Sequence, residues 1–577
     1  MKQHETAACF QQMADLLEYC GDNPFRVRAY RRAAQNLSSF TGDLEALDAE
    51  ARLTEISGIG RDLAHKIHEF LATGRIAALS RLRRSVPRGV LELVKIPGVG
   101  PKTARVLCER LRITTIDQLE AAVRAHRLLG LPGFQATKEA NILRGIAILR
   151  RGRERMRLGT ALPLAQALLA FLAKVPGVGQ TSAAGSLRRM CETIGDLDLL
   201  AASSSPRRVM AAFCSSPFVA RVLARGDTKS SILTRDDLQV DLRVVPSDSF
   251  GAALQYFTGS KEHNVRLREM AVRRGLKVNE YGVFRVKGGA RIAGREEADV
   301  YAALGLPWIP PELREDRGEL DAARARQLPR LVEAGDIRGD FHIHSRWSDG
   351  SDRLEVMAEA GRARGYEYLA MCDHSPLLKV AHGMTAARLR SQLAVIDGLN
   401  ARATRYRVLK GAEVDILPDG RLDYPDAVLQ ELDVVTGSVH TNFRQGRELM
   451  TRRIIRAMRH PLVTLIAHPT GRIIGRRDPY DVDLDAVLRA AADTRTALEI
   501  NASPERLDLC DTAAAQARQR GVMLALSTDA HSRGELNDMA IGLGVARRAW
   551  LQPRHLLNCF TLRELLTWVA VKRRGAR

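Results

Sequence analysis

The chain has 577 residues, of which 45% are hydrophobic and 27% charged, and its formal net charge is +21. This length exceeds one compact core, so we expect about three or four folded domains, and the composition leaves little room for long disordered tracts. So positive a charge favours a polyanionic partner, for which nucleic acid and an anionic membrane surface compete.

The cysteines and the amino terminus bear on the cellular compartment. The eight cysteines include no CxxC pair, and a chain of this size does not depend on disulfides, so we expect reduced thiols. The first twenty residues, MKQHETAACFQQMADLLEYC, mix charge with apolar residues, and no apolar run in the chain approaches the ~18 residues of a membrane span. These features predict a cytoplasmic protein with no membrane partner.

Residues 1 to about 155 have apolar positions at helical spacing, separated by glycine-centred turns, and predict an all-α region. Two of the turns have the pattern Ile-x-Gly-x-Gly, with Gly58 and Gly60 in one and Gly98 and Gly100 in the other. Glycine permits a tight turn that exposes backbone N–H groups to a DNA phosphate. Both turns resemble helix-hairpin-helix motifs, which hold the DNA backbone without reading its sequence. A turn between helices with no ligand is the alternative for either motif alone.

From about 185 to 300, short strands mixed with helices predict an α+β domain. Asp196 and Asp198 lie two apart in an apolar strand, so their carboxylates share one face. Asp241, in a second strand, can add a third carboxylate. Three such groups suit two Mg²⁺ ions, which in polymerases activate a 3′-hydroxyl and neutralise a triphosphate. A surface acidic pair is the alternative for the DxD pattern taken alone.

A glycine-containing turn lies just upstream of these aspartates. The segment Gly185-Ser186-Leu187-Arg188-Arg189 provides a turn, a hydroxyl and, one helical turn later, a guanidinium. Such groups at a helix N-terminus suit the terminal phosphates of a nucleotide. We therefore expect substrate phosphates to bind beside the carboxylates.

The last part of the chain has a different pattern. A Pro-bearing, highly charged stretch from Trp308 predicts a linker, and from 336 onward strand-like segments alternate with helical ones, as in a barrel or a doubly wound sheet. Imidazole and carboxylate groups, which are transition-metal ligands, fall at the strand ends, although any single histidine is more often structural. These residues are His342, His344, Asp349, His374, Glu413, His440, His468, Asp529 and His531.

The segment GSLRRMCETIGDLDLL closely resembles the nucleotidyltransferase motif of family X DNA polymerases. The resemblance continues through VDLRVVP, with the third aspartate, and YFTGSKEHNVRLR, which matches the family's dNTP-binding segment. It implies that Ser186, Arg189 and Gly195 contact the triphosphate. It also implies that Tyr256, Phe257 and Gly259 pack against the sugar, that Asn264 contacts the minor-groove edge of the base, and that Arg268 faces the templating position.

Two further glycine turns are weaker candidates for DNA binding than the first pair. The segment LPGF at 131–134 is a weaker third candidate because it lacks the second glycine. The segment VPGVG at 175–179 occupies the position of the family's turn into a strand, so we assign it no DNA contact. The residues that follow, 179–184, have low strand propensity where family members have β-branched residues.

The segments NPFRVRAYRRAA and SGIGRDLAHKIHEFLATG resemble the small amino-terminal domain of the same family, which in DNA polymerase beta also removes deoxyribose phosphate. Lys66 aligns with its Schiff-base lysine, and Tyr30 matches a residue of its pocket. A basic pocket can activate a lysine as a nucleophile, and the nearby arginines suit one. Against this, Asp62 replaces a second lysine, so a solvated Lys66 on a DNA-binding helix is the alternative. The arginines are Arg26, Arg28, Arg31 and Arg32.

The motifs HIHSRWSDG, CDHS, GAEVDI, GSVH, AHP and STDAH occur in the order of the polymerase and histidinol phosphatase (PHP) domain, a distorted (β/α)7 barrel. The resemblance implies that the nine residues named above hold a trinuclear Mn²⁺ or Zn²⁺ cluster, with Glu413 bridging two metals. A barrel kept only as a scaffold is the alternative. His382 is left without a ligand role. Four basic residues either guide a DNA 3′ end or are solvated, namely Lys379, Arg472, Arg476 and Arg477.

Together the resemblances imply a bacterial family X polymerase that fills short gaps in base excision repair. Its expected partners are gapped or primer-template DNA and dNTPs, with Mg²⁺ or Mn²⁺ at the polymerase site. The barrel is expected to have a 3′-5′ exonuclease or 3′-end-processing activity. We expect the protein to be a monomer. The rival reading is a phosphoesterase whose polymerase-like half serves as a DNA-binding module. The expected domains are lyase-like (1–85), fingers-type (86–155), palm (156–247), thumb (248–315), linker (316–335) and barrel (336–577).

Overall fold

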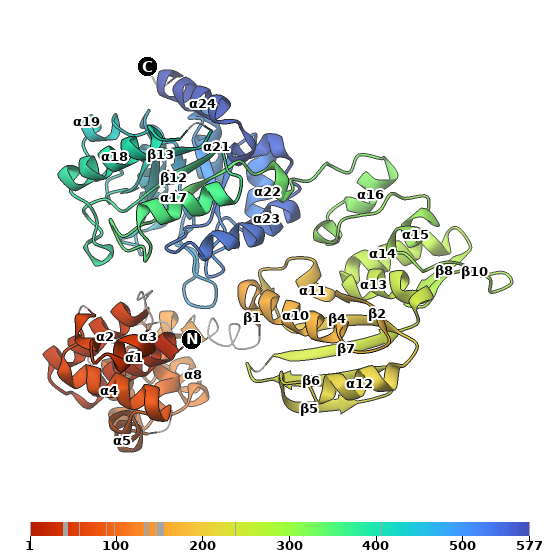
Figure 1. Ribbon diagram of the computed structural model, residues 1–577, viewed down its shortest axis with the longest axis horizontal. Coiled ribbons are helices and arrows are strands. Elements are labelled where there is room, and N and C mark those ends of the chain that lie inside the picture. Colours follow the sequence, from red (N-terminus) through yellow and green to blue (C-terminus); the bar gives the residue numbers. More distant parts are fainter. Residues whose placement is uncertain are drawn as a thin grey trace. The chain divides into compact units, whose positions relative to one another are not determined.

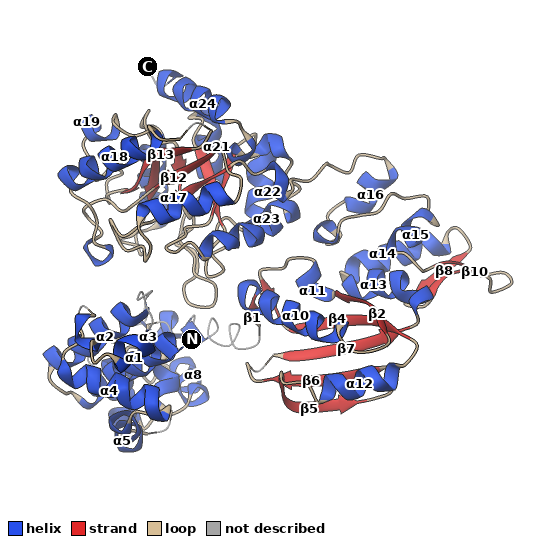
Figure 2. Cartoon of the chain, in the orientation of Figure 1, coloured by secondary structure: helices blue, strands red, loops and turns tan. Residues whose placement is uncertain are grey.

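The computed structural model describes residues 2–38, 44–56, 58–87, 89–96, 98–131, 134–135, 138–143, 145–146, 155–236, 238–403 and 405–575. The chain divides into two compact units. The first contains Met1–Arg153 together with the short segments Gly350–Asp352 and Gly475–Asp478, and the second is formed by Glu154–Asp349, Arg353–Ile474 and Pro479–Arg577. Figures 1 and 2 show the elements of each unit. No helix in the described ranges has the length and apolar character needed to span a bilayer.

The first unit is helical, as the sequence predicts (Figure 2). Its buried side chains form one hydrophobic cluster that runs from Ala7 to Ile146, and Ile67 and Leu107 are both completely buried in it. The expected division after residue 85 therefore separates helices that share one core. The helices are α1 (Lys2–Cys20), α2 (Pro24–Ser38), α3 (Leu44–Ala49), α4 (Arg61–Thr73), α5 (Ala77–Ser85), α6 (Val90–Val94), α7 (Pro101–Leu111) and α8 (Ile116–Arg124).

The region expected to be the palm, which we call the palm below, is built on a five-stranded sheet with strand order β2-β4-β7-β6-β5, in which only β4 and β7 are parallel neighbours. The strands are β2 (Val178–Ala183), β4 (Asp196–Ser203), β5 (Val219–Arg225), β6 (Lys229–Thr234) and β7 (Gln239–Val245). A short pair, β1 (Met156–Arg157) and β3 (Thr193–Ile194), lies beside it. The helices are α10 (Leu158–Ala173), α11 (Gly185–Arg188) and α12 (Pro206–Cys214).

Strand β2 forms despite its weak strand propensity. Gly177, with φ of +90°, makes the turn before it, and residues 178–183 pair antiparallel with β4. Ladder pairing with an apolar central strand outweighs the local preference of Gly, Gln and Ser, because strand propensity depends strongly on context. The VPGVG segment thus leads into a strand, as we interpreted it.

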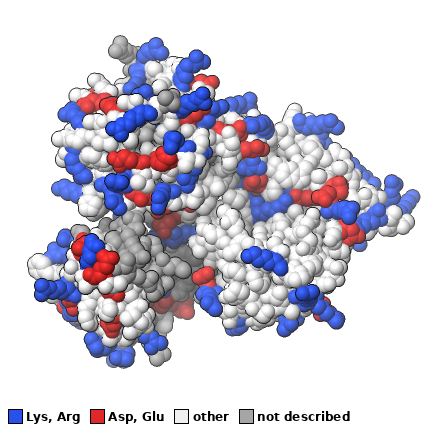
Figure 3. Space-filling model, viewed as in Figure 1, with Lys and Arg blue, Asp and Glu red and all other residues white. Residues whose placement is uncertain are grey.

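The thumb combines helices with a small sheet. Its elements are α13 (Phe250–Thr258), α14 (Lys261–Val272), β8 (Leu276–Asn279), β9 (Gly282–Arg285), β10 (Arg291–Ala293) and α15 (Glu297–Ala302). The sheet has the order β10-β9-β8, and its strand pairs are antiparallel. Figure 3 shows lysines and arginines gathered at the tip that carries these strands, where Arg285 and Lys287 are exposed.

The segment 316–335, expected to be a linker, folds onto the thumb instead. It contains α16 (Glu319–Arg324), and its Leu320 and Leu331 belong to the thumb's hydrophobic cluster. Glu319 is completely buried and lies 2.6 Å from Nδ1 of His263. Its high charge suggests a solvated connection, but Glu319 has a buried partner and the leucines cover the thumb core.

The barrel is a seven-stranded, all-parallel sheet whose strands follow one another in chain order. Hydrogen bonds between its first and last strands nearly close it, from His344 N to Ala530 O at 2.9 Å and from Asp529 N to His342 O at 3.0 Å. The expected distorted (β/α)7 barrel is confirmed. The strands are β11 (Gly339–Ile343), β12 (Tyr368–Met371), β13 (Arg407–Asp415), β14 (Val434–Ser438), β15 (Leu465–Ile466), β16 (Ala497–Asn501) and β17 (Leu524–Ser527).

Helices cover this sheet, because strands buried on both faces need apolar partners on each side. They are α17 (Leu354–Ala363), α18 (Ala386–Asn400), α19 (Asp426–Leu429), α20 (Arg447–Met458), α21 (Leu484–Asp493), α22 (Asp511–Gln519), α23 (Met539–Arg548) and α24 (Leu562–Gly575). One hydrophobic cluster contains residues of both the palm and the barrel, such as Leu187 and Val545. The second unit is therefore packed continuously from palm to barrel.

Candidate polymerase site and metal centre

The three palm aspartates lie on adjacent parallel strands. Asp196 and Asp198 begin β4, and the register of β4 with β7 sets Asp198 directly opposite Asp241. Because side chains alternate along a strand, Asp196 shares the face of Asp198. Asp196 is exposed, Asp198 half-buried and Asp241 buried. The arrangement is open to solvent at one end and enclosed at the other.

These carboxylates lie close enough to perturb one another. Burial, and then the negative charges of Asp196 and Asp241, raises the pKa of Asp198 to about 6. Burial acts in the same direction on Asp241, but hydrogen bonds from Lys229 and Gln239 outweigh it and lower the pKa of this carboxyl. The Lys229 ammonium lies 2.9 Å from Oδ2 of Asp241. A site that already attracts one cation suits divalent ions as well.

The turn before α11 depends on glycine. Gly185 has φ of +59°, and a Cβ there would lie 2.4 Å from Oδ2 of Asp198, so a larger residue would be both strained and displaced. The N–H of Ala184 donates to the Asp198 carbonyl at 2.8 Å. Ser186, the second residue of α11, is thereby held beside the carboxylate pair.

The two arginines of GSLRR contact the thumb. Arg188 donates to both oxygens of Glu297, at 2.6 and 2.8 Å, and to the Thr258 hydroxyl. Arg189 donates to the Thr258 carbonyl at 2.5 Å and to Glu315 at 3.0 Å. The expected triphosphate arginine therefore connects α11 to the end of α13. The other expected phosphate contact, Gly195, faces Arg155, whose Nη1 would lie 3.1 Å from a Cβ at that position.

The expected sugar and base contacts come from α13, α14 and the turn between them. Tyr256 and Phe257 pack edge to face, with ring centroids 5.1 Å apart, and Gly259 follows α13 with φ of +72°. The Asn264 side chain donates to the Tyr256 carbonyl at 2.7 Å. The backbone carbonyl of Asn264 accepts a hydrogen bond from Arg268 Nε at 3.2 Å. The structure thus brings these residues together. Sequence reasoning missed Gln255, a buried residue that donates to the Asn264 side chain at 2.8 Å.

In the first unit, the two glycine turns each begin a helix. Gly58 and Gly98 have φ of +77° and +89°, and Gly60 and Gly100 are the N-caps of α4 and α7. Neither N-cap has a side-chain hydrogen bond. The helix N-termini offer backbone N–H groups of the kind that bind phosphate. The third candidate, at 131–134, lies partly outside the described residues.

Lys66 lies on α4 and forms an i,i+4 ion pair with Asp62. Its side chain is only 12% exposed, so it is not the fully solvated lysine of the alternative reading. Two of the expected pocket arginines have acidic partners, Arg26 with Asp22 and Arg31 with Glu18. Tyr30 is buried against Phe10, with ring centroids 5.7 Å apart.

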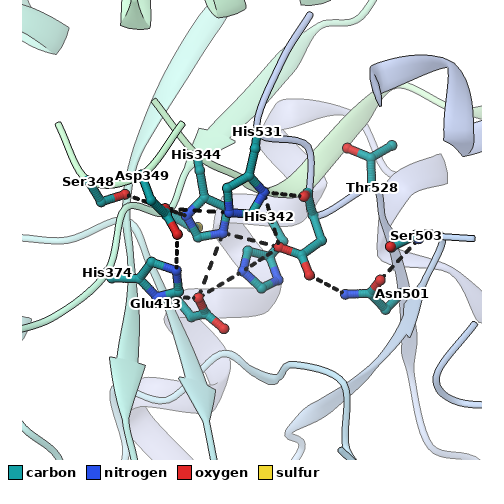
Figure 4. A network of polar contacts seen from close by, with 12 residues as sticks. His342, His344, Ser348, Asp349, His374, Glu413, Asn501, Ser503, Thr528 and His531 are labelled. Carbon is teal, nitrogen blue, oxygen red and sulfur yellow. Dashed lines mark hydrogen bonds and ion pairs between the residues drawn. The ribbon is translucent and has the colours of Figure 1, made fainter. Parts of the chain in front are cut away.

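The nine expected metal ligands of the barrel lie at or just after the carboxyl ends of its strands. His342 lies within β11 and Glu413 within β13, and the others follow β11, β12, β14, β15 and β17. Figure 4 shows His344, His374 and His531 turned toward Asp349 and Glu413. Parallel strands end at one rim of a barrel, so residues nearly 190 positions apart in the chain meet at one place.

The ligand atoms form three groups, in each of which they lie within 4.8 Å of one another. The groups overlap at His344 and His374. His468 belongs to none of them, but its Nε2 lies 3.0 Å from Glu413 Oε1. The groups are His344, Asp349, His374 and His531; His342, His344 and Asp529; and His374, Glu413 and His440.

Several buried atoms of the cluster make no hydrogen bond of ordinary geometry to the described residues, although Nδ1 of His374 and Oε2 of Glu413 lie 2.7 Å apart. They are Nε2 of His342, both ring nitrogens of His344, Nδ1 of His374 and Oε2 of Glu413. A buried polar atom without a partner is costly, and a cation offsets that cost. Among the described residues, these nitrogen and oxygen donors fit a multinuclear metal site.

Further carboxylates orient the ligands. His342 has Glu499 at 2.8 Å from its Nδ1, and His440 has Asp415 at 3.2 Å from its own Nδ1. Such partners fix the tautomer of a metal-binding imidazole. Sequence reasoning missed both, although Asp415 lies in GAEVDI and Glu499 in ALEINAS. For Asp415 the available signal was its place in the same strand-end motif as Glu413, whereas for Glu499 it was only a carboxylate within a strand-like segment of the barrel.

Other candidate residues lie outside the cluster. Arg472 is not the solvated arginine of the alternative: its side chain is 14% exposed, its Nη2 lies 2.7 Å from Glu192 of the palm, and its Nε donates to the Arg506 carbonyl. Lys379 and His382 are exposed in the loop after β12. Arg476 and Arg477 lie in the loop after β15.

Family comparisons assign four parts of the chain. Helix-hairpin-helix families match residues 1–76, as the helix-hairpin-helix domain, and 90–147, as the SAM-like helix-hairpin-helix tandem. The DNA polymerase beta thumb family matches residues 253–315, and the PHP domain family matches residues 340–503. These matches cover the glycine turns, the thumb and most of the metal cluster.

Curated relatives match over different extents. A protein of Bacillus subtilis, "DNA polymerase/3'-5' exonuclease PolX", is 39% identical over 98% of this chain and 99% of its own length. Rat DNA polymerase lambda is 26% identical over 50% of this chain and 52% of its own. A protein of Syntrophotalea carbinolica, named "Probable phosphatase", is 30% identical over 38% of this chain and 90% of its own.

Proposed function

The chain belongs to the bacterial PolX family, the family X DNA polymerases that carry helix-hairpin-helix, thumb and carboxy-terminal PHP domains, and on that basis we propose that it is a DNA polymerase and 3′-5′ exonuclease that fills short gaps during base excision repair. The palm extends a 3′ end opposite a template base. The barrel removes nucleotides or blocking groups from 3′ ends. The two activities prepare and then fill the same gap.

One observation carries the polymerase assignment, namely the pairing of Asp198 with Asp241 across β4 and β7, with Asp196 on the same face. Two Mg²⁺ or Mn²⁺ ions bound there would supply an activated 3′-hydroxyl and neutralise the triphosphate. The chain's own part is to hold the three carboxylates together and to present the α11 turn beside them. The close approach of Gly185 to Asp198 supports that turn as the phosphate site.

The barrel assignment rests on the buried donor set. The nine residues would hold Mn²⁺ or Zn²⁺, which lower the pKa of water and so supply a nucleophile for phosphoester hydrolysis. The carboxylates of Glu499 and Asp415 orient the imidazoles, and Asn501 donates to Asp529 at 3.0 Å. The name of the Bacillus subtilis relative supports a 3′-5′ exonuclease as the activity.

Primer extension on gapped DNA with a 5′ phosphate tests both assignments. We expect Asp196→Ala to abolish synthesis and keep 3′ degradation, and His342→Ala to do the reverse. Two controls match them: Asp248→Ala removes an exposed carboxylate that pairs with Arg291, and His460→Ala removes a histidine that pairs with Asp426 outside the metal cluster. Synthesis unaffected by Asp196→Ala would refute the polymerase assignment.

A second candidate is a phosphoesterase whose polymerase-like half only binds DNA. The similarity of 38% of the chain to a protein named "Probable phosphatase" favours it. In that case the wild-type protein extends no primer, whereas it still releases phosphate or nucleotides in a His342-dependent manner. The same experiment therefore separates the two functions.

The remaining expectations join the proposal. The substrates are gapped or primer-template DNA and dNTPs, and the glycine turns at Gly58, Gly60, Gly98 and Gly100 hold the DNA backbone. Exposed arginine and lysine on the thumb tip support a polyanionic partner (Figure 3). We also propose a cytoplasmic monomer. We also propose a deoxyribose-phosphate lyase activity at Lys66. For this activity, the Lys66 amine must first leave its ion pair with Asp62.

A further inference from the structure

A helix of the barrel contacts the turn that ends the GSLRR segment of the palm. Gly544 and Arg548 lie four residues apart on α23, and so on the same face of the helix. A Cβ at Gly544 would lie 2.6 Å from the Met190 side chain, so the glycine lets the helix approach closely. Arg548 reaches the adjacent residue, donating from Nη1 to the Arg189 carbonyl at 2.8 Å.

The same guanidinium also fixes the partner of the Arg189 side chain. Arg548 Nη1 lies 2.7 Å from Oε1 of Glu315, and that oxygen accepts from Arg189 Nε at 3.0 Å. Arg189 in turn donates to the Thr258 carbonyl at the end of α13. One barrel arginine therefore holds the backbone of Arg189 directly and its side chain through Glu315.

Arg548 is itself held in place. It is 8% exposed, and its Nη2 lies 2.9 Å from Oδ2 of Asp511, a carboxylate that also pairs with Arg317 at 2.9 Å. A buried guanidinium with several charge-assisted partners has little rotamer freedom. The contact of Arg548 with Arg189 is thus rigid enough to fix the position of the Arg189 backbone.

We propose that Arg548 of the barrel is a positioning residue for nucleotide binding in the palm. It fixes the turn after α11 against the end of α13, where the triphosphate and sugar contacts converge. The barrel, beyond carrying its own metal site, then contributes to dNTP affinity. This inference rests on the proposed polymerase function and adds to it a residue from outside the palm and thumb.

The neighbouring arginine provides a matched control. Arg547, on the same helix, pairs with Glu312 at 2.7 Å and donates to the Val332 carbonyl, so it connects the barrel to residues near the thumb without touching Arg189. If Arg548 only held the two halves together, the loss of either arginine would have the same kind of effect. A specific role in nucleotide binding predicts different effects.

The experiment measures kcat and KM for dNTP during single-gap filling by the full-length protein, together with 3′ degradation in the absence of dNTP. For Arg548→Met we expect KM for dNTP to rise about tenfold with kcat within about twofold, as when binding is lost without a change in chemistry. Exonuclease activity should equal that of the wild type. Arg547→Met should keep the wild-type KM.

A wild-type KM in Arg548→Met, alongside normal gap filling by the wild-type protein, would overturn this inference and leave the proposed function intact. A joint fall of kcat and exonuclease activity with a lower melting temperature would also overturn it, because that pattern marks general destabilisation. If Arg548→Met does not fold, Arg548→Lys replaces it, because lysine keeps the charge but lacks the planar set of N–H donors. The KM of Arg548→Lys for dNTP is expected to be several-fold above wild type. An unchanged KM overturns the inference. If the wild-type protein fills no gap, both proposals fall.

Discussion

Glu499 lies 2.8 Å from Nδ1 of His342, so the first imidazole expected to bind metal in the barrel is oriented by a carboxylate from its sixth strand. The other oxygen of Glu499 accepts the backbone N–H of His468 at 2.6 Å. One buried carboxylate therefore positions two of the expected ligands. Removal of this carboxylate should therefore lower the metal affinity of the barrel before it affects any other property.

We predict that Glu499→Ala weakens metal binding by the barrel roughly 10- to 100-fold, the usual effect of losing a group that orients a ligand. Calorimetric titration of the metal-free protein with Mn²⁺ measures this, and 3′ degradation should need correspondingly more Mn²⁺. The control is Glu431→Ala, which removes a carboxylate paired with Arg390 instead. Equal Mn²⁺ affinities in Glu499→Ala and wild type would show that the carboxylate plays no such part.

Gly185→Ala should impair synthesis by more than about 100-fold while 3′ degradation persists. The new Cβ would meet Asp198 at 2.4 Å in a backbone conformation that L residues rarely adopt, so the turn and the carboxylate must both move. Gap-filling rates measure the loss. Gly398→Ala is the control, because that helical glycine has open space around it and alanine is the better helix former. Normal synthesis by Gly185→Ala would refute the role given to the α11 turn.

The thumb should become less stable as acid protonates Glu297. Burial opposes its charge, but Arg188 and Arg314 outweigh burial and lower the pKa of this carboxyl from its ordinary 4.5 to about 2. Because the folded-state pKa is the lower one, the stabilisation is complete above pH ~4.5 and is lost as the pH falls toward 2. It is on the order of 3 kcal/mol.

Hydrogen exchange of the α15 amides between pH 5 and pH 3 measures this loss as a falling free energy of opening. In Glu297→Gln the pH dependence should be nearly flat, since no proton is gained. An equally steep pH dependence in wild type and Glu297→Gln would assign the effect to other carboxylates.

Removing metal should destabilise the barrel. Ions that bind only the folded state add about 2.7 kcal/mol at 100 times their dissociation constant, and chelation withdraws that contribution from the buried histidines and carboxylates. Calorimetry of the Mn²⁺-loaded protein with and without EDTA should show a lower melting temperature after chelation. His342→Ala should respond less, and a wild-type protein indifferent to both EDTA and Mn²⁺ would contradict a metal-holding barrel.

The lyase hypothesis predicts opposite effects at two residues of one helix. Lys66→Ala should abolish borohydride trapping on DNA with a 5′ deoxyribose phosphate. Asp62→Ala should increase trapping, because the Lys66 amine must leave its ion pair with this carboxylate before it can attack an aldehyde. Trapping that survives in Lys66→Ala would place the activity on another residue or exclude it.

The strand-end motifs allowed most of the barrel to be predicted from sequence. Segments such as FHIHS and STDAH combine a short buried strand with ligand residues at its end, and strand order along the chain then brings them to one rim. The pairing of Asp198 with Asp241 could be expected only in part: the spacing gives the shared face of one strand, whereas the parallel register with β7 depends on tertiary packing.

Contacts between distant segments were not accessible to such reasoning. Glu315 and Arg548 are 233 residues apart and share no motif, so their pairing follows only from the packing of α23 against the palm. Local charge was also misleading for residues 316–335, where Glu319 is buried by a partner, His263, that lies on another helix. Features that depend on one helix or strand could be predicted from sequence, whereas contacts between residues of different elements could not.

The hydrogen bonds that join β11 to β17 have a consequence during synthesis of the chain. His342 and His344 leave the ribosome long before Asp529 and His531, and the barrel rim exists only once the last strand has paired with the first. A chain interrupted before residue 524 would carry the palm aspartates but not a complete set of barrel ligands. Any activity of the barrel site would thus be withheld from unfinished copies, because its expected ligands follow both the first and the last strand.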